Sequence, residues 1–174
     1  MIRYVAFLRG INSGFNPTTK MDVLRNAFEE LGFQNVKTVI ASGNVLFEAE
    51  AADENDLEQT IEKALPKAIG FASATIVYKF DDLQKLAKLN AFKAIDVTPN
   101  TRPYVTFLKE PPKNNTKLSG KGFKLLKRSG RALFSVVDLS DGTTLDLMKV
   151  LDKEFGKTNT TRGWKTIEKI LEKG

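Results

Sequence analysis

The chain has 174 residues, of which 41% are hydrophobic and 28% are charged, a balance that allows one sizeable core or two small halves. It contains no cysteine and no histidine, which excludes disulfides, thiolate nucleophiles, Ser-His-Asp triads and the common zinc sites. The formal charge is +6, which favours anionic partners. No apolar run approaches the roughly 20 residues that a bilayer crossing requires, so we expect a cytoplasmic protein without a membrane partner.

The first eighty residues alternate between strand-like and helix-like patterns. Residues 2–8 form a near-continuous apolar run, which predicts a strand buried on both faces. Apolar residues at helical spacing predict helices over 21–31 and 53–69, the first with a capping box from Thr19 and Asp22. Three more strands are predicted over 36–40, 45–47 and 74–80. This β-α-β-β-α-β order is that of a ferredoxin-like unit.

The second half predicts an imperfect copy of the first. A short helix after Asp81 leads to strands over 104–108, 123–127 and 132–139. Helices follow over 145–155 and from Thr160-Thr161 onward. No literal repeat is recognised, so the duplication rests on the order of elements. The predicted fold is α+β, with a ferredoxin-like half over 1–80 and a second, imperfect ferredoxin-like half over 81–174, packed together as one compact unit.

Three motifs together carry a family resemblance. They are YVAFLRGIN (4–12), SGNVLFE (42–48) and TTRGWKTIEKIL (160–171). In this order they resemble the mostly bacterial domain-of-unknown-function family 1697, whose members read Y-x-A-L-L-R-G-I-N-V-G-G, S-G-N-V-x-F and T-R-N-W-x-T. The resemblance implies a duplicated ferredoxin-like arrangement and candidate positions, but no reaction. This chain departs from the pattern at Phe15, where a glycine is usual, and at Gly163, where an asparagine is usual.

The first candidate site follows the first predicted strand and comprises Arg9, Gly10, Asn12 and Gly14. A loop between a strand and a helix presents backbone N–H groups and the positive end of a helix dipole to an anion. The spacing matches neither a phosphate-binding Walker loop nor the dinucleotide fingerprint. The alternative is structural: Arg9 pairs with a carboxylate, and Asn12 ties down the turn.

Two further polar clusters are candidates for the same ligand. Ser42 and Asn44 flank a glycine in a predicted turn, which turn formation alone can explain. We expect the first and third strands to run parallel, which would place Arg9 and Asn44 at opposite ends of the sheet. Thr161 is a predicted N-cap. Arg162 in the first turn of that helix would be opposed by the helix dipole and would need a compensating partner or an anionic ligand.

A basic segment is the candidate surface for nucleic acid. Residues 111–137 contain seven basic side chains and no Asp or Glu. A positive field of this kind attracts polyanions, and a solvated face is the simpler explanation. The interleaved aromatics of a typical RNA-binding sheet are absent. The basic residues are Lys113, Lys117, Lys121, Lys124, Lys127, Arg128 and Arg131.

Three functional hypotheses remain open at this point. The first is a non-enzymatic binding module for an anionic or phosphate-bearing small ligand, using Arg9 and Arg162 because a guanidinium matches phosphate and carboxylate oxygens. The second is nucleic-acid binding through the basic segment. The third is a histidine-free, metal-assisted enzyme, for which Asp138 and Asp141 are too few ligands to define a metal site. We expect no cofactor, and the oligomeric state is open.

Overall fold

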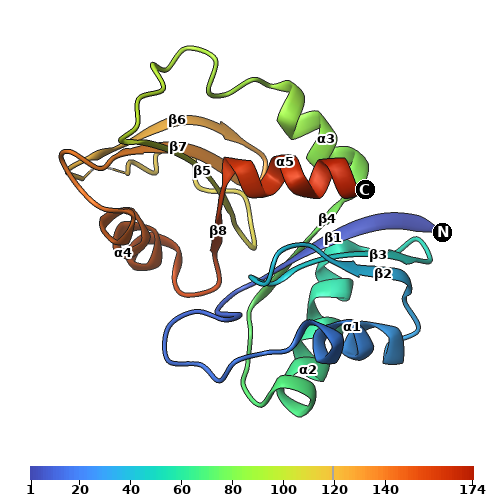
Figure 1. Cartoon of the computed structure of the whole chain (residues 1–174). Coiled ribbons are helices and arrows are strands. Elements are labelled where there is room, and N and C mark those ends of the chain that lie inside the picture. Colours follow the sequence, from blue (N-terminus) through green and yellow to red (C-terminus); the bar gives the residue numbers. More distant parts are fainter. Residues whose placement is uncertain (119) are drawn as a thin grey trace. The chain divides into compact units, whose positions relative to one another are not determined.

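The structure is a computed structural model that describes residues 1–118 and 120–174. The chain forms two compact units, Met1–Lys85 with Glu168–Gly174 and Leu86–Ile167. Each unit contains one four-stranded sheet in which neighbouring strands run antiparallel (Figure 1). The fold is therefore α+β, and the two sheets agree with the predicted duplication. No helix in the described residues is long and apolar enough to cross a membrane.

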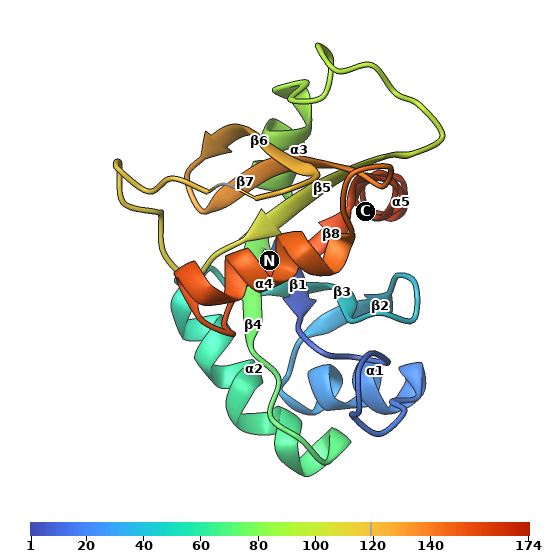
Figure 2. The same ribbon diagram turned by 90° about the vertical axis from the view of Figure 1, so that its left-hand side faces the viewer.

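The first unit has the predicted β-α-β-β-α-β order. Its sheet order is β2-β3-β1-β4, so β1 and β3 are central and β2 and β4 are edges. Helices α1 and α2 lie on one face of this sheet (Figure 2). The elements are β1 (Ile2–Leu8), α1 (Met21–Glu30), β2 (Gln34–Thr38), β3 (Asn44–Ala49), α2 (Glu54–Ile69) and β4 (Thr75–Lys79).

Phe47 on β3 lies at the centre of the first core. Its ring stacks on Tyr4 and Phe33 at centroid distances of 5.5 and 4.6 Å, and Phe28 meets it edge-on at 5.5 Å. Alternate strand residues share a face of the sheet, and the helices add residues at i, i+3 and i+4 spacing. The core therefore joins side chains from β1, β3, α1 and α2, among them Ala6, Leu8, Val45, Leu24, Leu57 and Ile61.

The second unit repeats the sheet topology of the first. Its sheet order is β6-β7-β5-β8, which is the order β2-β3-β1-β4 with each strand replaced by its counterpart. The boundaries between the units fall within α3 and α5. The remaining elements are α3 (Phe80–Lys88), β5 (Thr101–Phe107), β6 (Phe123–Ser129), β7 (Ala132–Asp138), α4 (Thr144–Phe155), β8 (Thr160–Gly163) and α5 (Trp164–Lys173).

The second unit lacks a counterpart of α1. The described residues between β5 and β6 form no helix, so α4 is the one helix that connects two strands of this sheet. Leu147 and Leu151 of α4 pack on Leu133 and Val137 of β7. Trp164 is half-buried, and its ring packs against those of Phe92 and Phe134 at centroid distances of 5.1 and 6.0 Å.

A short similarity marks the duplication in the sequence itself. Residues 5–9 read VAFLR and residues 105–109 read VTFLK. These segments end β1 and β5, which hold the same place in their sheets. The N–H of Leu8 donates to Gly43 O and the N–H of Leu108 donates to Arg131 O, both at 2.8 Å. Three of the five residues are identical and the match is confined to this strand end, so it is a local similarity and not a literal repeat.

The segment before the last helix differs from the prediction. Thr160–Gly163 forms the edge strand β8, paired with β5, and α5 begins only at Trp164. Two consecutive β-branched residues favour a strand over a helical turn. Thr161 is consequently not an N-cap, and its hydroxyl instead bonds to the hydroxyl of Thr106 at 2.8 Å. Arg162 therefore lies in a strand, and the argument from a helix dipole does not apply to it.

The start of α1 also differs from the prediction. Its N-cap residue is Lys20, without a side-chain capping bond, so Thr19 and Asp22 form no capping box. The Thr19 hydroxyl is buried and has no hydrogen-bond partner among the described residues. The backbone of Thr19 is instead held by a side chain in the preceding loop, which belongs to the candidate site.

Three glutamates of α2 cover the outer edge of β4. Residues four positions apart in a helix are separated by about 6 Å along the helix axis. Residues two positions apart in a strand are separated by about 6.6 Å along the strand. The carboxylates therefore match successive outward N–H groups of the strand. Glu58 is almost fully buried, at 1% exposure. The acceptor and donor pairs are Glu54 with Lys79, Glu58 with Val77 and Glu62 with Thr75, each at 2.8 Å.

Replacing Glu58 tests this edge protection. Glu58→Ala leaves the buried Val77 N–H without this acceptor, so we expect it to lower the free energy of unfolding by about 1–3 kcal/mol. Glu58→Gln keeps an acceptor oxygen and should lose clearly less. Urea unfolding followed by circular dichroism measures both. Equal losses of unfolding free energy in Glu58→Ala and Glu58→Gln would show that the acceptor oxygen does not stabilise the strand edge.

Candidate functional site

The end of β1 lies beside the start of β3, where Phe7 is opposite Asn44. The expectation that these strands run parallel was wrong. The α1 crossover makes β2 run in the direction of β1, and the following turn reverses β3, so β1 and β3 are antiparallel. The segment after β1 and the turn before β3 therefore meet at one end of the sheet. We call the Arg9–Gly14 segment, the Ala41–Asn44 turn and Ser73 the strand-end cluster.

Asn12 joins the two segments of the strand-end cluster. Its backbone has φ of 52°, a left-handed conformation that asparagine tolerates. Its Nδ2 donates to Ala41 O at 2.9 Å and to Thr19 O at 3.1 Å, and its Oδ1 accepts from the Thr19 N–H at 2.8 Å. These bonds use both amide hydrogens, so Asn12 holds the cluster together.

Gly43 allows the close approach of the turn to β1. Its φ is 82°, and a Cβ atom there would lie 2.9 Å from Leu8 O. Any larger residue would therefore push the turn away from the strand. The adjacent Asn44 is buried, and its Nδ2 donates to Val39 O at 3.0 Å and to Ser42 Oγ at 3.1 Å. Because Ser42 Oγ accepts this bond, the hydrogen of its hydroxyl remains a donor for another acceptor.

The backbone of Arg9 is fixed on both sides. Its N–H donates to Ala74 O at 2.9 Å, and its carbonyl accepts from Ser73 Oγ at 2.7 Å. The Arg9 residue is half-buried. Sequence reasoning missed Ser73, because a serine two residues before the start of a strand carries no pattern of its own. The role of Ser73 is recognised only when β4 is paired with β1, which brings the Ser73 hydroxyl to the Arg9 carbonyl.

Glycines shape the loop that follows Arg9. Gly10 has φ of 80°, and a Cβ atom there would lie 2.8 Å from Asn16 Nδ2, which donates to Gly10 O at 3.0 Å. Gly14 also has a positive φ, at 62°. The next residue, Phe15, is fully exposed. The loop thus turns tightly beside the strand end and leaves residues 12–18 at the surface.

The strand-end cluster has a positive electrostatic character. Residues 9–20, 39–44 and 71–75, which meet there, contain Arg9 and Lys20 and no Asp or Glu. The carboxylate of Glu62 reaches this region from α2, where its Oε1 accepts from the Thr75 N–H. Segments of one charge sign raise the local concentration of the opposite ion.

Arg162 belongs to the second unit, whereas the residues of the strand-end cluster belong to the first. Its Nη1 donates to Thr160 Oγ1 at 2.6 Å and to Thr161 O at 3.1 Å. Burial disfavours the charged form and lowers the pKa of Arg162 to about 10. At neutral pH the group is therefore a buried cation, held there at a cost of about 3 kcal/mol.

Replacing Arg162 tests how its buried charge is balanced. Arg162→Met removes the charge and also the hydrogen bonds to Thr160 and Thr161, so the two effects oppose each other and we expect the free energy of unfolding at pH 7 to change by less than about 2 kcal/mol. The folded state loses its proton first, so the cost is fully present below pH 10 and is relieved as the pH rises above about 10. The parent should therefore gain stability relative to the variant as the pH rises above 10. Urea unfolding at several pH values measures this, and a loss above about 2 kcal/mol at pH 7 would contradict it.

The basic segment divides into two groups in the structure. Arg128 Nη2 donates to Thr116 O and Arg131 Nη1 donates to Lys109 O at 3.3 Å, so both arginines hold the preceding loop. The lysines form the other group and are exposed on this loop and on β6: Lys113, Lys117, Lys121, Lys124 and Lys127. The segment is thus partly structural and partly an exposed basic surface.

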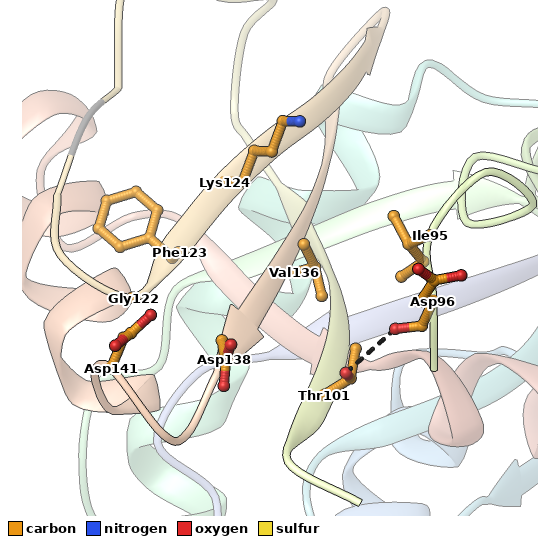
Figure 3. Close-up of a pocket in the computed structure, with 9 residues that line it drawn as sticks. All are labelled: Ile95, Asp96, Thr101, Gly122, Phe123, Lys124, Val136, Asp138 and Asp141. Carbon is orange, nitrogen blue, oxygen red and sulfur yellow. Dashed lines mark hydrogen bonds between the residues drawn. The ribbon is translucent and has the colours of Figure 1, made fainter. Parts of the chain in front are cut away.

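A hollow of about 350 Å³ lies on the second sheet beside the start of β6 (Figure 3). Lys124, Asp96, Asp138 and Asp141 line it, together with apolar residues. Hydrogen bonds from the Ser140 hydroxyl and backbone N–H, at 2.6 and 2.9 Å, lower the pKa of Asp138. The Asp138 carboxylate therefore stabilises the turn that contains Asp138 and Ser140. No group of three or more carboxylates suited to a metal ion occurs in the described residues.

Comparisons with known proteins bear on fold and family. Residues 1–122 match the family described as "Protein of unknown function (DUF1697)", so the third motif, over 160–171, lies outside the matched part. The structure is similar to that of the conserved bacterial protein SP0830 from Streptococcus pneumoniae, with a TM-score of 0.67 and 21% identity over 98% of this chain and 97% of that one. At this identity the similarity shows the fold alone. No curated protein matches the chain.

Proposed function

The chain belongs to the DUF1697 family, whose description names no activity, and we propose that it binds a small phosphate- or carboxylate-bearing ligand at the strand-end cluster. One observation carries this proposal. The antiparallel pairing of β1 with β3 brings the Arg9 segment to the Ser42–Asn44 turn. Two polar clusters that are 33 positions apart in the sequence become one surface, and neither supplies an acidic side chain.

The chemistry of the strand-end cluster suits an anion. A guanidinium donates several N–H bonds in a planar fork that fits phosphate or carboxylate oxygens. The bonds of Arg9 to Ala74 and Ser73 fix its Cα position, which reduces the entropy lost when the side chain orders around a ligand. The Ser42 hydroxyl supplies a second donor on the neighbouring turn. Charge-assisted bonds of this kind contribute about 1.5–3 kcal/mol each.

Binding is favoured over catalysis at this place. The strand-end cluster contains serines, which can act as nucleophiles, but its residues include no Asp, Glu, His or Cys that would activate a serine as a general base. Arginine remains protonated at neutral pH and serves as an electrostatic partner rather than a proton acceptor. The residue types of the cluster thus support recognition of charge and shape.

Nucleic-acid binding through the exposed lysines is the second candidate. The observation in its favour is that five lysines of the 113–127 region are exposed, with no carboxylate in the same stretch of sequence. Binding of this kind depends steeply on salt, because neutralised phosphates release condensed counterions. A small anion held by Arg9 should respond much less to salt, so the two candidates separate in a single set of titrations.

The Arg9→Gln variant tests the first candidate. Loss of one or two charge-assisted bonds should weaken binding of pyrophosphate about 10- to 100-fold, measured by isothermal titration calorimetry at constant ionic strength. Arg25→Gln is the matched control, because it removes the same charge from another half-buried arginine, on α1 of the same unit. Thermal unfolding confirms that both variants fold.

Equal weakening in both variants would show that net charge, and not the strand-end cluster, attracts the anion. A single-stranded oligonucleotide in the same titrations examines the second candidate. Tight, salt-sensitive oligonucleotide binding, with no pyrophosphate binding in the parent protein, would overturn the first candidate in favour of the second.

A further inference from the structure

The end of β5 in the second unit corresponds to the end of β1 in the first. Each strand closes with the sequence V-x-F-L followed by a basic residue, Arg9 or Lys109. In each unit the N–H of the preceding leucine donates at 2.8 Å to a carbonyl of the turn before the neighbouring central strand, Gly43 O or Arg131 O. Lys109 is therefore the positional counterpart of Arg9.

A cavity of about 390 Å³ opens beside Lys109. On one side lies the segment after β5, where the first unit continues toward α1. On the other side lie the C-terminal end of α4 and the approach to β8, represented by Phe155 and Asn159. The volume of this cavity is in the range that small-molecule sites occupy.

The backbone around this cavity is held in place. Arg131 Nη1 donates to Lys109 O at 3.3 Å, and Arg128 Nη2 donates to Thr116 O. Pro111 and Pro112 restrict the φ angles of the segment between these two anchors. Asn159 Nδ2 donates to Gly156 O at 2.7 Å and to Asp152 Oδ1 at 3.1 Å on the opposite side. The cavity is therefore bordered on both sides by hydrogen-bonded segments.

The lining combines one half-buried cation with an apolar wall. Lys109 is half-buried, whereas the other charged lining residues, Lys113, Glu110 and Glu154, are exposed. Solvent screens exposed charges more strongly than half-buried ones, so Lys109 has the largest effect on a ligand inside the cavity. The apolar wall is formed by Leu108, Pro111, Pro112 and Phe155.

We infer that the second unit carries a binding site of its own, for a small ligand with an anionic head and an apolar body. Its head contacts the Lys109 ammonium, and its body packs on Phe155 and the two prolines. The ligand class is that of aromatic or aliphatic phosphate monoesters and carboxylates. The choice of an anion rests on the proposed function of Arg9, whereas the cavity and its apolar wall are independent of it.

Phenyl phosphate is the probe that tests this site. Amide chemical shifts of the full-length ¹⁵N-labelled protein should change saturably for residues 108–116 and 154–159 when phenyl phosphate is added at constant ionic strength. Inorganic phosphate, which lacks the ring, should bind these residues at least threefold more weakly. Lys109→Gln should weaken phenyl phosphate binding there at least tenfold. Lys165→Gln is the matched control, because Lys165 is an exposed lysine of the same unit. This variant should change the affinity for phenyl phosphate by less than twofold.

The outcomes of this titration separate the two sites. No saturable change in residues 108–116 and 154–159, or an unchanged affinity in Lys109→Gln, overturns the second site, whatever happens at the strand-end cluster. Chemical-shift changes of residues 108–116 and 154–159 that persist in Arg9→Gln support the second site. This holds even if the strand-end cluster responds to no phosphate. Equal weakening by Lys109→Gln and Lys165→Gln overturns the second site in favour of a nonspecific charge effect.

Discussion

The antiparallel pairing of β1 with β3 determines where the polar residues of the first unit lie. Phe7 opposite Asn44 places the end of one strand beside the start of the other, and Gly43 permits the contact because a side chain there would meet Leu8 O. Asn12 then bonds across to the turn. A parallel pairing would have separated these groups by the length of the sheet. The strand topology therefore brings the residues of the candidate site together, and their side-chain chemistry determines what they can bind.

The edges of the two sheets are protected in four different ways. Three carboxylates of α2 accept from the outward N–H groups of β4. The strand β8 is only four residues long, and β2 has an irregular register along its pairing with β3. On β6, two exposed lysines flank a shift in register. Lysines and bulges are common protections of exposed edges, so part of the basic character of β6 has a structural explanation.

Local sequence patterns predicted most of the helices and strands. The features that were predicted wrongly depend on contacts between residues that are distant in the sequence. The apolar run of β1 and the helical stripe of α2 were visible in the sequence because burial leaves a periodic trace. The direction of β3 relative to β1 was predicted wrongly, because it follows from the order of connections, a helical crossover and then a reversing turn, and not from any local residue pattern. Thr160–Gly163 was predicted as a helix start, although β-branched residues and pairing with β5 make it a strand. Ser73 left no local trace, because its partner, Arg9, is distant in the sequence.

The repeat of V-x-F-L with a basic residue gives the two units a common design. In each, a central strand delivers a cation to the point where a turn and the segment before an edge strand meet. The first unit closes this place with a glycine-rich loop and α1. The second leaves a cavity there.

The most direct measurement is an amide chemical-shift titration of the first unit within the full-length protein, with pyrophosphate at constant ionic strength. If the strand-end cluster is one site, the amides of residues 9–14 and of residues 42–44 shift together and report the same dissociation constant. Shifts confined to the exposed lysines of residues 113–127, with residues 9–14 and 42–44 unchanged, would contradict the account.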